Sequence, residues 1–119
     1  MDRFGRAPAQ QWLRIAFFAA AAIAFAMAVI PTPDLVPIDS DKLQHMLAFF
    51  TLGMLGAGGF RRRSFLAVLL WLAAFGALIE IVQEIPALNR DSDVMDWLAD
   101  LAASFVALTI ARAIWPRLE

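Results

Sequence analysis

Four long apolar runs, joined by short polar segments, dominate the pattern of the sequence. The runs cover about residues 12–30, 42–60, 64–85 and 95–115. Nineteen residues of α-helix, at about 1.5 Å per residue, extend about 28 Å, which matches the roughly 30 Å hydrocarbon core of a bilayer. The pattern therefore predicts an all-α fold, with a single membrane domain over residues 1–119 built as an integral bundle of four transmembrane helices.

The polar segments between the runs carry residues that begin or end helices. The first connection, residues 31–41, contains three prolines, which remove backbone donors and favour an extended chain. At its end, Ser40 or Asp41 is suited to cap the N-terminus of the second helix. Arg61–Arg63 separates the second run from the third, and Pro86 closes the third run.

The first run has a competing interpretation as a cleaved signal peptide. Arg3, Arg6 and Arg14 would form its basic region, and the small residues of Ala26–Ala28 resemble a cleavage site. The run is longer than the 7 to 15 apolar residues typical of a signal peptide. This length favours an uncleaved first span.

Composition excludes several classes of protein. Of the 119 residues, 61% are hydrophobic and 18% are charged, and the mean hydropathy is +0.68. A soluble domain is nearer half apolar and a quarter charged, so the composition supports a membrane protein. The net charge of -1 and the dispersed basic residues argue against a nucleic-acid partner. Without cysteine, disulfides, thiol nucleophiles and cysteine zinc sites are excluded.

Basic residues lie at one end of this four-helix arrangement and acidic residues at the other. Eight of the ten Lys and Arg residues fall at the end with both termini, the exceptions being Lys42 and Arg90. Nine of the eleven Asp and Glu residues fall at or near the opposite end. Because cytoplasmic loops carry an excess of Lys and Arg, this pattern predicts cytoplasmic termini. We expect a multi-pass protein of the bacterial cytoplasmic (inner) membrane with an acidic end facing outward.

Near the outward end, ionisable and amide side chains recur at helical spacing. Side chains three or four residues apart share a helix face, as do Asp41 and His45, or Glu80 and Gln83. Charged groups near the end of a membrane helix are costly unless they pair, meet water or serve a function. The predicted ligand-binding residues are Asp41, Lys42, His45, Glu80, Gln83, Arg90 and Asp96.

The same residues also have a purely structural interpretation. Acidic side chains in the first turn of a helix favour its dipole, and a histidine is often a hydrogen-bonded packing residue. Glu80 fits this interpretation least well, because it is the deepest acid of the third run. We therefore expect Glu80 to have a cationic partner, which would be Arg90, Lys42 or His45.

Two spaced blocks of the sequence carry a resemblance to a known family. Residues 41–53, DKLQHMLAFFTLG, are similar to the Asp-Lys-x-x-His-x-x-x-Phe signature of VanZ-like membrane proteins. The second block matches the family pattern in order and spacing at Gly76, Glu80, Gln83, Arg90 and Asp96. The resemblance covers about residues 39–107, and it departs from the family at Asp100 and Ala103, where Asn and Gly are usual.

The resemblance implies a small multi-pass bacterial membrane protein of the cell envelope. Because the namesake of the family is linked to reduced susceptibility to the glycopeptide teicoplanin, it also implies a link to antibiotic resistance. It supplies no reaction that could be transferred to this chain.

Three hypotheses for function follow. In the favoured one, cations of the predicted set hold the phosphate of a membrane lipid or a lipid-linked envelope precursor, while its carboxylates and amide bind sugars or orient those cations. The second is a membrane enzyme in which His45 acts as acid or base and Glu80 or Asp96 orients it. The third is a structural or partner-binding bundle held together by interhelical hydrogen bonds.

No cofactor or metal is expected. A metal held by His45, Glu80, Asp96 and Asp100 is a variant of the enzyme hypothesis, but a single histidine offers little affinity for zinc. The acidic residues do not have the spacing of a calcium loop. The small residues of the helices would also allow a homo-oligomer.

Overall fold

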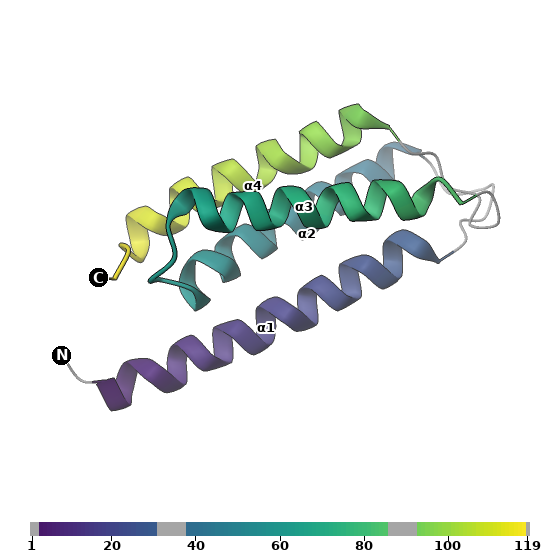
Figure 1. Cartoon of the computed structure of the whole chain (residues 1–119). Helices are drawn as coiled ribbons and strands as arrows, with labels where there is room; N and C mark the ends of the chain where they lie inside the picture. Colours follow the sequence, from purple (N-terminus) through teal and green to yellow (C-terminus); the bar gives the residue numbers. More distant parts are fainter. Residues whose placement is uncertain (1–2, 31–37, 86–92, 119) are drawn as a thin grey trace.

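The computed structural model describes residues 3–30, 38–85 and 93–118, and describes side chains from Ala9 onward in the first of these segments and from Lys42 onward in the second. This part of the chain forms four α-helices: α1 (Arg3–Val29), α2 (Ile38–Gly59), α3 (Phe65–Gln83) and α4 (Val94–Ile114). The helices run alternately up and down in an elongated bundle that measures 53 × 22 × 20 Å (Figure 1). The predicted all-α fold is confirmed.

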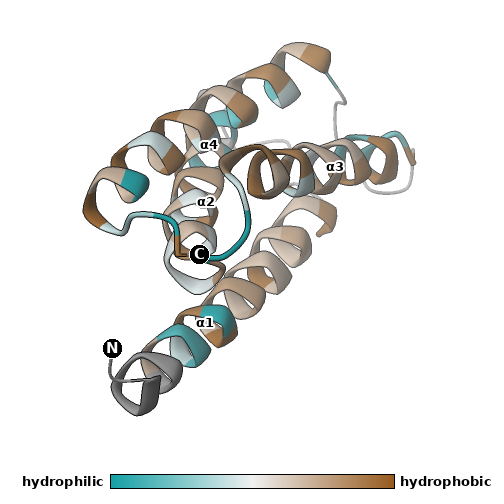
Figure 2. Cartoon of the chain, turned by 60° about the vertical axis from the view of Figure 1, so that its left-hand side comes forward, coloured by the Kyte–Doolittle hydropathy of each residue, from teal (hydrophilic) through white to brown (hydrophobic). Residues whose placement is uncertain are grey.

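The two ends of the bundle differ in chemistry. The start of α1, the short connection between α2 and α3, and the end of α4 lie at one end (Figure 1). Figure 2 shows hydrophilic residues at this end, whereas the helix bodies are largely hydrophobic. We call it the arginine-rich end, because it carries Arg14, Arg61, Arg62, Arg63, Arg112 and Arg117. The opposite end, where α2 and α4 begin and α1 and α3 finish, is called the polar end.

The starts of α3 and α4 agree with the predicted ones, and each has an N-cap. Ser64 caps α3, because its Oγ accepts a hydrogen bond from the Ala67 amide at 3.0 Å. Asp93 caps α4, because its Oδ1 accepts from the Met95 amide at 2.9 Å. These starts lie within two residues of the predicted ones.

The predicted start of α2 is wrong. The helix begins at Ile38, so Ser40 and Asp41 lie inside its first turn and not at the N-cap position. The apolar run begins only at Leu43, and the polar residues 39–42 belong to the helix although they give no apolar signal.

Three of the four helices are long and apolar enough to cross a bilayer. The spans cover Ala9–Val29, Phe65–Gln83 and Val94–Ile114. Large apolar side chains such as Trp12, Ile23 and Leu70 are more than half exposed on the outside of the bundle. A soluble monomer rarely exposes so much contiguous apolar surface. These features indicate a multi-pass membrane protein.

The remaining helix, α2, does not meet the same criterion, although the sequence pattern predicts four spans. Lys42, Gln44, His45 and the glycines near its end lower its hydropathy. This helix makes its most extensive contacts with α4 and then with α1. Much of its surface therefore faces protein, which reduces the need for an apolar side chain at every position.

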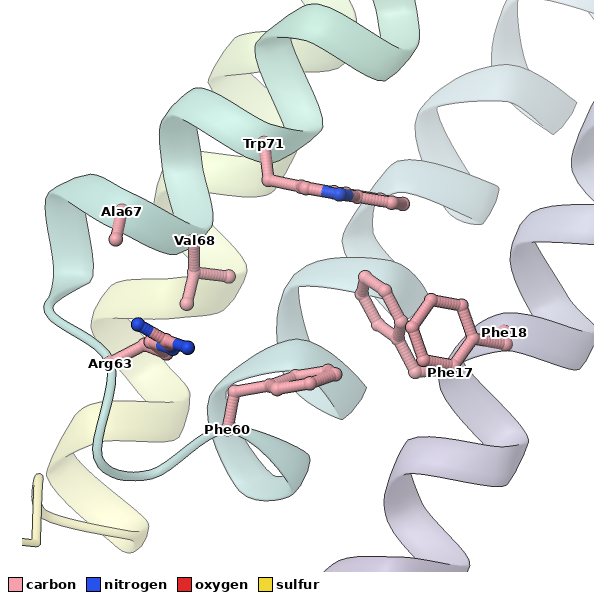
Figure 3. A pocket seen from close by; sticks show the side chains of 7 residues that line it. All are labelled: Phe17, Phe18, Phe60, Arg63, Ala67, Val68 and Trp71. Carbon is pink, nitrogen blue, oxygen red and sulfur yellow. The ribbon is translucent and has the colours of Figure 1, made fainter.

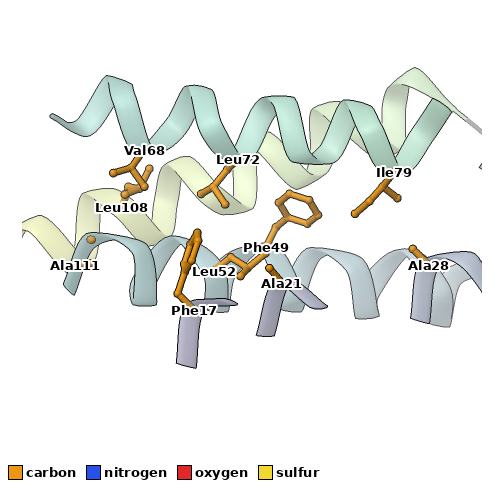
Figure 4. Close-up of a cluster of buried hydrophobic side chains, with 11 residues drawn as sticks. Phe17, Ala21, Ala28, Phe49, Leu52, Val68, Leu72, Ile79, Leu108 and Ala111 are labelled. Carbon is orange, nitrogen blue, oxygen red and sulfur yellow. The ribbon is translucent and has the colours of Figure 1, made fainter. Parts of the chain in front are cut away.

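The core between the helices is built from side chains of all four. Phe49 and Leu52 of α2 meet Val68 and Leu72 of α3 at the centre, with Leu108 of α4 beside them (Figure 4). The full cluster comprises Phe17, Ala21, Ala28, Phe49, Leu52, Ala57, Val68, Leu72, Ile79, Leu108 and Ala111. Its small members lie on α1, α2 and α4, where they let the helices approach closely.

Gly53 is a point of close approach between α2 and α4. A Cβ atom at this position would lie 2.8 Å from the Ala107 Cβ and 3.0 Å from the Ser104 carbonyl oxygen. Neither atom can move without moving the α4 backbone. Gly53 therefore allows the close packing of α2 against α4.

Replacing Gly53 by alanine is expected to destabilise the bundle by about 1–3 kcal/mol, the usual cost of overpacking. The measurement is thermal unfolding of the purified protein in detergent. Gly58→Ala is the matched control, because the atoms nearest to its new Cβ belong to the side chains of Leu13 and Trp115, which can shift. Equal losses of stability in the two variants would contradict the assigned α2–α4 contact.

Candidate ligand site at the polar end of the bundle

An ion pair joins the first turns of α2 and α4. Lys42 Nζ lies 3.2 Å from Asp96 Oδ1, and the two side chains are 44% and 28% exposed. A pair with this exposure contributes little to stability, because water competes for both charges. The charges therefore remain accessible at the rim of the polar end.

Glu80 reaches from α3 to the beginning of α4. Its Oε2 accepts a hydrogen bond from the Asp93 backbone amide at 2.9 Å. The amides that begin a helix have no partner within it, and a carboxylate there also interacts favourably with the helix dipole. Two of the cationic partners expected for Glu80 were Lys42 and Arg90. Lys42 is paired with Asp96, and Arg90 lies outside the described residues.

Gln83 joins the ends of α3 and α1. Its Nε2 donates a hydrogen bond to the Ala28 carbonyl at 3.1 Å, and the residue is 3% exposed. Ala28 lies in the last turn of α1, where backbone carbonyls receive no hydrogen bond from an amide of the same helix. Gln83 therefore satisfies one buried carbonyl that water would not reach.

His45 lies one turn deeper than Lys42 on α2. It is partly buried, with its ring Nε2 enclosed, and it lines a small cavity of about 20 Å³ together with Ala28 and Ile79. A cavity of this size can hold about one water molecule. The histidine thus faces the space between α1, α2 and α3, below the rim.

Three aspartates at the start of α4 become more buried with distance from the rim. Asp93 is exposed, Asp96 is partly exposed, and Asp100 is only 2% exposed. Ser104 Oγ donates to the Asp100 carbonyl at 2.9 Å, one turn further down. Asp100 is the buried carboxylate of this end, although the predicted ligand-binding set omits it. Its spacing of four residues from Asp96 was the available signal.

Trp97 is a second residue that the predicted set lacks. Its Nε1 donates to the Ala73 carbonyl of α3 at 2.9 Å. Gly76 leaves room for the indole, because a Cβ at that position would lie 3.1 Å from the Trp97 Cδ1. The glycine of the second sequence block thus has a packing role at the α3–α4 contact.

The structure brings Lys42, His45, Glu80, Gln83 and Asp96 to the same end of the bundle, from three different helices. The Asp41 side chain and Arg90 lie outside the described residues. Within the described ranges, no three His, Asp or Glu side chains are arranged to hold a metal ion. The five side chains supply one ammonium, one imidazole, one amide and two carboxylates.

No family model, curated protein or solved structure matches this chain. The resemblance to VanZ-like proteins therefore rests on the two sequence blocks.

Removing the Glu80 carboxylate is expected to loosen the beginning of α4. Glu80→Ala deletes the acceptor of the Asp93 amide, and loss of such a cap costs about 0.5–2 kcal/mol. Hydrogen exchange at the amides of residues 93–97 should accelerate, and the unfolding temperature in detergent should fall by a few degrees. Glu84→Ala removes an equal charge from an exposed neighbour and should leave both quantities unchanged. Similar exchange in the two variants would show that Glu80 does not support α4.

Proposed function

We propose that the chain crosses the bacterial cytoplasmic membrane four times, with both termini and the arginine-rich end in the cytoplasm. The membrane position of α2 is supported by its length of 22 residues, its place alongside the three apolar helices and its exposed Leu43 and Leu47. The orientation is supported by the arginines at that end, six of which have described side chains.

Single cysteines test this topology cleanly, because the chain contains no cysteine of its own. In intact cells, Glu84→Cys at the polar end should react with an impermeant maleimide, and Gln11→Cys at the other end should react only after lysis. Both side chains are exposed, so a thiol placed there can react. Labelling of Gln11→Cys alone in intact cells would reverse the proposed orientation.

We further propose that the polar end binds the headgroup of a membrane lipid or of a lipid-linked envelope precursor. The observation that supports this function is the Lys42–Asp96 pair, which is held at the rim yet remains partly exposed. An ammonium has three donors, so Lys42 can keep Asp96 as one acceptor and offer the others to a phosphate. His45 lies one turn deeper on the same helix.

The surrounding charge narrows the class of ligand. Glu80, Asp93 and Asp96 would repel a ligand that carried only negative charge. A headgroup with hydroxyl or amino groups beside its phosphate suits the site better, because these groups can donate to the carboxylates. Sugar phosphates and zwitterionic headgroups have this chemistry. The resemblance to VanZ-like proteins supports an envelope-related member of this class.

A structural role is the second candidate, and specific hydrogen bonds favour it. Glu80 binds the start of α4, Gln83 binds the end of α1, and Trp97 binds the middle of α3. Each bond joins two helices through a backbone group. In this alternative, the polar residues hold the bundle together and no ligand is required.

Lys42→Ala separates the two candidates. Native mass spectrometry of the protein extracted in mild detergent should show a bound phosphate-containing lipid in the parent and its loss in the variant. The unfolding temperature should change by no more than a few degrees, since an exposed pair contributes about 0–1 kcal/mol. Arg62→Ala, which removes an exposed positive charge from the opposite end, should retain the lipid. An unchanged lipid spectrum in Lys42→Ala would favour the structural role.

A further inference from the structure

A groove opens on the outside of the bundle near the arginine-rich end. It has a volume of about 340 Å³, within the range typical of ligand pockets, which is roughly 300–1,000 Å³. It lies between α1 and α3, beside the C-terminal end of α2 (Figure 3). Its lining consists of Phe17, Phe18, Phe60, Arg63, Ala67, Val68 and Trp71. The groove is separate from the polar end, and the proposed function does not use it.

Aromatic rings form the walls of the groove. Phe17 meets Phe60 edge-on at a centroid distance of 5.3 Å and lies 5.0 Å from the Trp71 ring. Phe17 is 3% exposed, whereas Phe18 and Trp71 are 54% and 43% exposed. The inner wall is therefore fixed by packing, and the outer rings face the surroundings of the helices, which are lipid in a membrane protein.

Arg63 differs in its contacts from most arginines at this end. Four other arginines bind backbone carbonyls through their guanidinium groups. Arg14, Arg112 and Arg117 bind carbonyls of residues 59–63, and Arg61 binds the Pro116 carbonyl. Within the described residues, the Arg63 side chain has no such hydrogen bond and no ion pair. It is exposed and extends along one end of the groove, between Phe60 and Val68 (Figure 3). Arg63 thus brings an uncommitted positive charge to an apolar groove.

We propose that this groove binds an anionic phospholipid from the leaflet at the arginine-rich end. An acyl chain lies against the exposed rings of Phe18 and Trp71, and the phosphate accepts hydrogen bonds from Arg63. The planar guanidinium suits this role, because it can donate two parallel hydrogen bonds to a phosphate. Trp71 adds an indole N–H that has no acceptor among the described residues and can donate to an ester carbonyl of the lipid.

Charge favours a lipid over a second copy of this chain as the occupant. Two copies with the same orientation in one membrane would bring their arginine-rich ends together. Arg63 would then approach a surface that carries more arginines, and like charges would oppose the contact. An anionic headgroup instead complements this surface.

Quenching of Trp71 fluorescence by brominated lipids tests the proposal. The protein is reconstituted in vesicles with increasing fractions of brominated phosphatidylglycerol or brominated phosphatidylcholine. Trp71→Phe provides the signal of the remaining tryptophans, which is subtracted. We expect half-maximal quenching of Trp71 at an approximately fivefold lower fraction of phosphatidylglycerol, which corresponds to about 1 kcal/mol for one basic residue near an anionic membrane surface.

Arg63→Gln should abolish this preference for phosphatidylglycerol. Arg62→Gln is the matched control, because it removes the same charge from the adjacent exposed residue, which does not line the groove, and it should keep the preference. Equal loss in both variants would show a general effect of surface charge and overturn the site. A preference that persists in Arg63→Gln, or a dimer without bound lipid in native mass spectrometry, would overturn it as well. If Arg63→Gln does not fold, a competition experiment on the parent replaces it. Excess phosphatidylglycerol without bromine must restore the Trp71 fluorescence that brominated phosphatidylglycerol has quenched, and failure to do so contradicts the proposal.

Discussion

The close packing of α2 at its glycines is the constraint on which the rest of the bundle depends. Lipid tails are as apolar as the helices, so helix association in a bilayer relies on van der Waals contact and hydrogen bonds rather than on exclusion of water. Gly53 allows α2 to touch the backbone of α4, and Gly59 allows it to touch the backbone of α1 at Arg14. These contacts turn α2 toward protein on two sides. The helix can therefore carry Lys42 and His45 in its first turns and present them between neighbouring helices.

The arginines have two roles at the arginine-rich end of the bundle. The last carbonyls of a helix have no partner within it, and they need donors where water is scarce. Arg14 donates to the Gly59 carbonyl, and Arg112 donates to the carbonyls of Phe60 and Arg63. The side chains that give this end its positive charge also join α1 and α4 to the connection between α2 and α3. A change of arginine to lysine would keep the charge but lose the several donors that one guanidinium directs at separate carbonyls.

Hydropathy was sufficient to predict the four helices but not every boundary or contact. The apolar runs placed the starts of α3 and α4 within two residues, and in the structure Ser64 and Asp93 cap these starts by binding amides two or three residues ahead. The helix α1 begins at Arg3, ahead of the predicted start near residue 12, because hydropathy marks only the apolar part of a helix. Helical spacing also predicted that the polar residues of three helices meet at one end. It did not predict that Glu80 binds a backbone amide, nor that rings from α1 and α3 and the end of α2 enclose a groove, since both depend on how the helices are rotated about their axes.

The separation of charge between the two ends makes the protein sensitive to the electrical potential across the membrane. In the proposed orientation, the arginines face a cytoplasm that is negative relative to the outside, and the carboxylates of Glu80, Asp93 and Asp96 face the positive side. A unit charge that crosses the full potential difference changes energy by about 2.3 kcal/mol per 100 mV. The resting potential of the cell therefore stabilises this orientation against inversion, and a loss of potential during insertion would weaken that bias before the helices have packed.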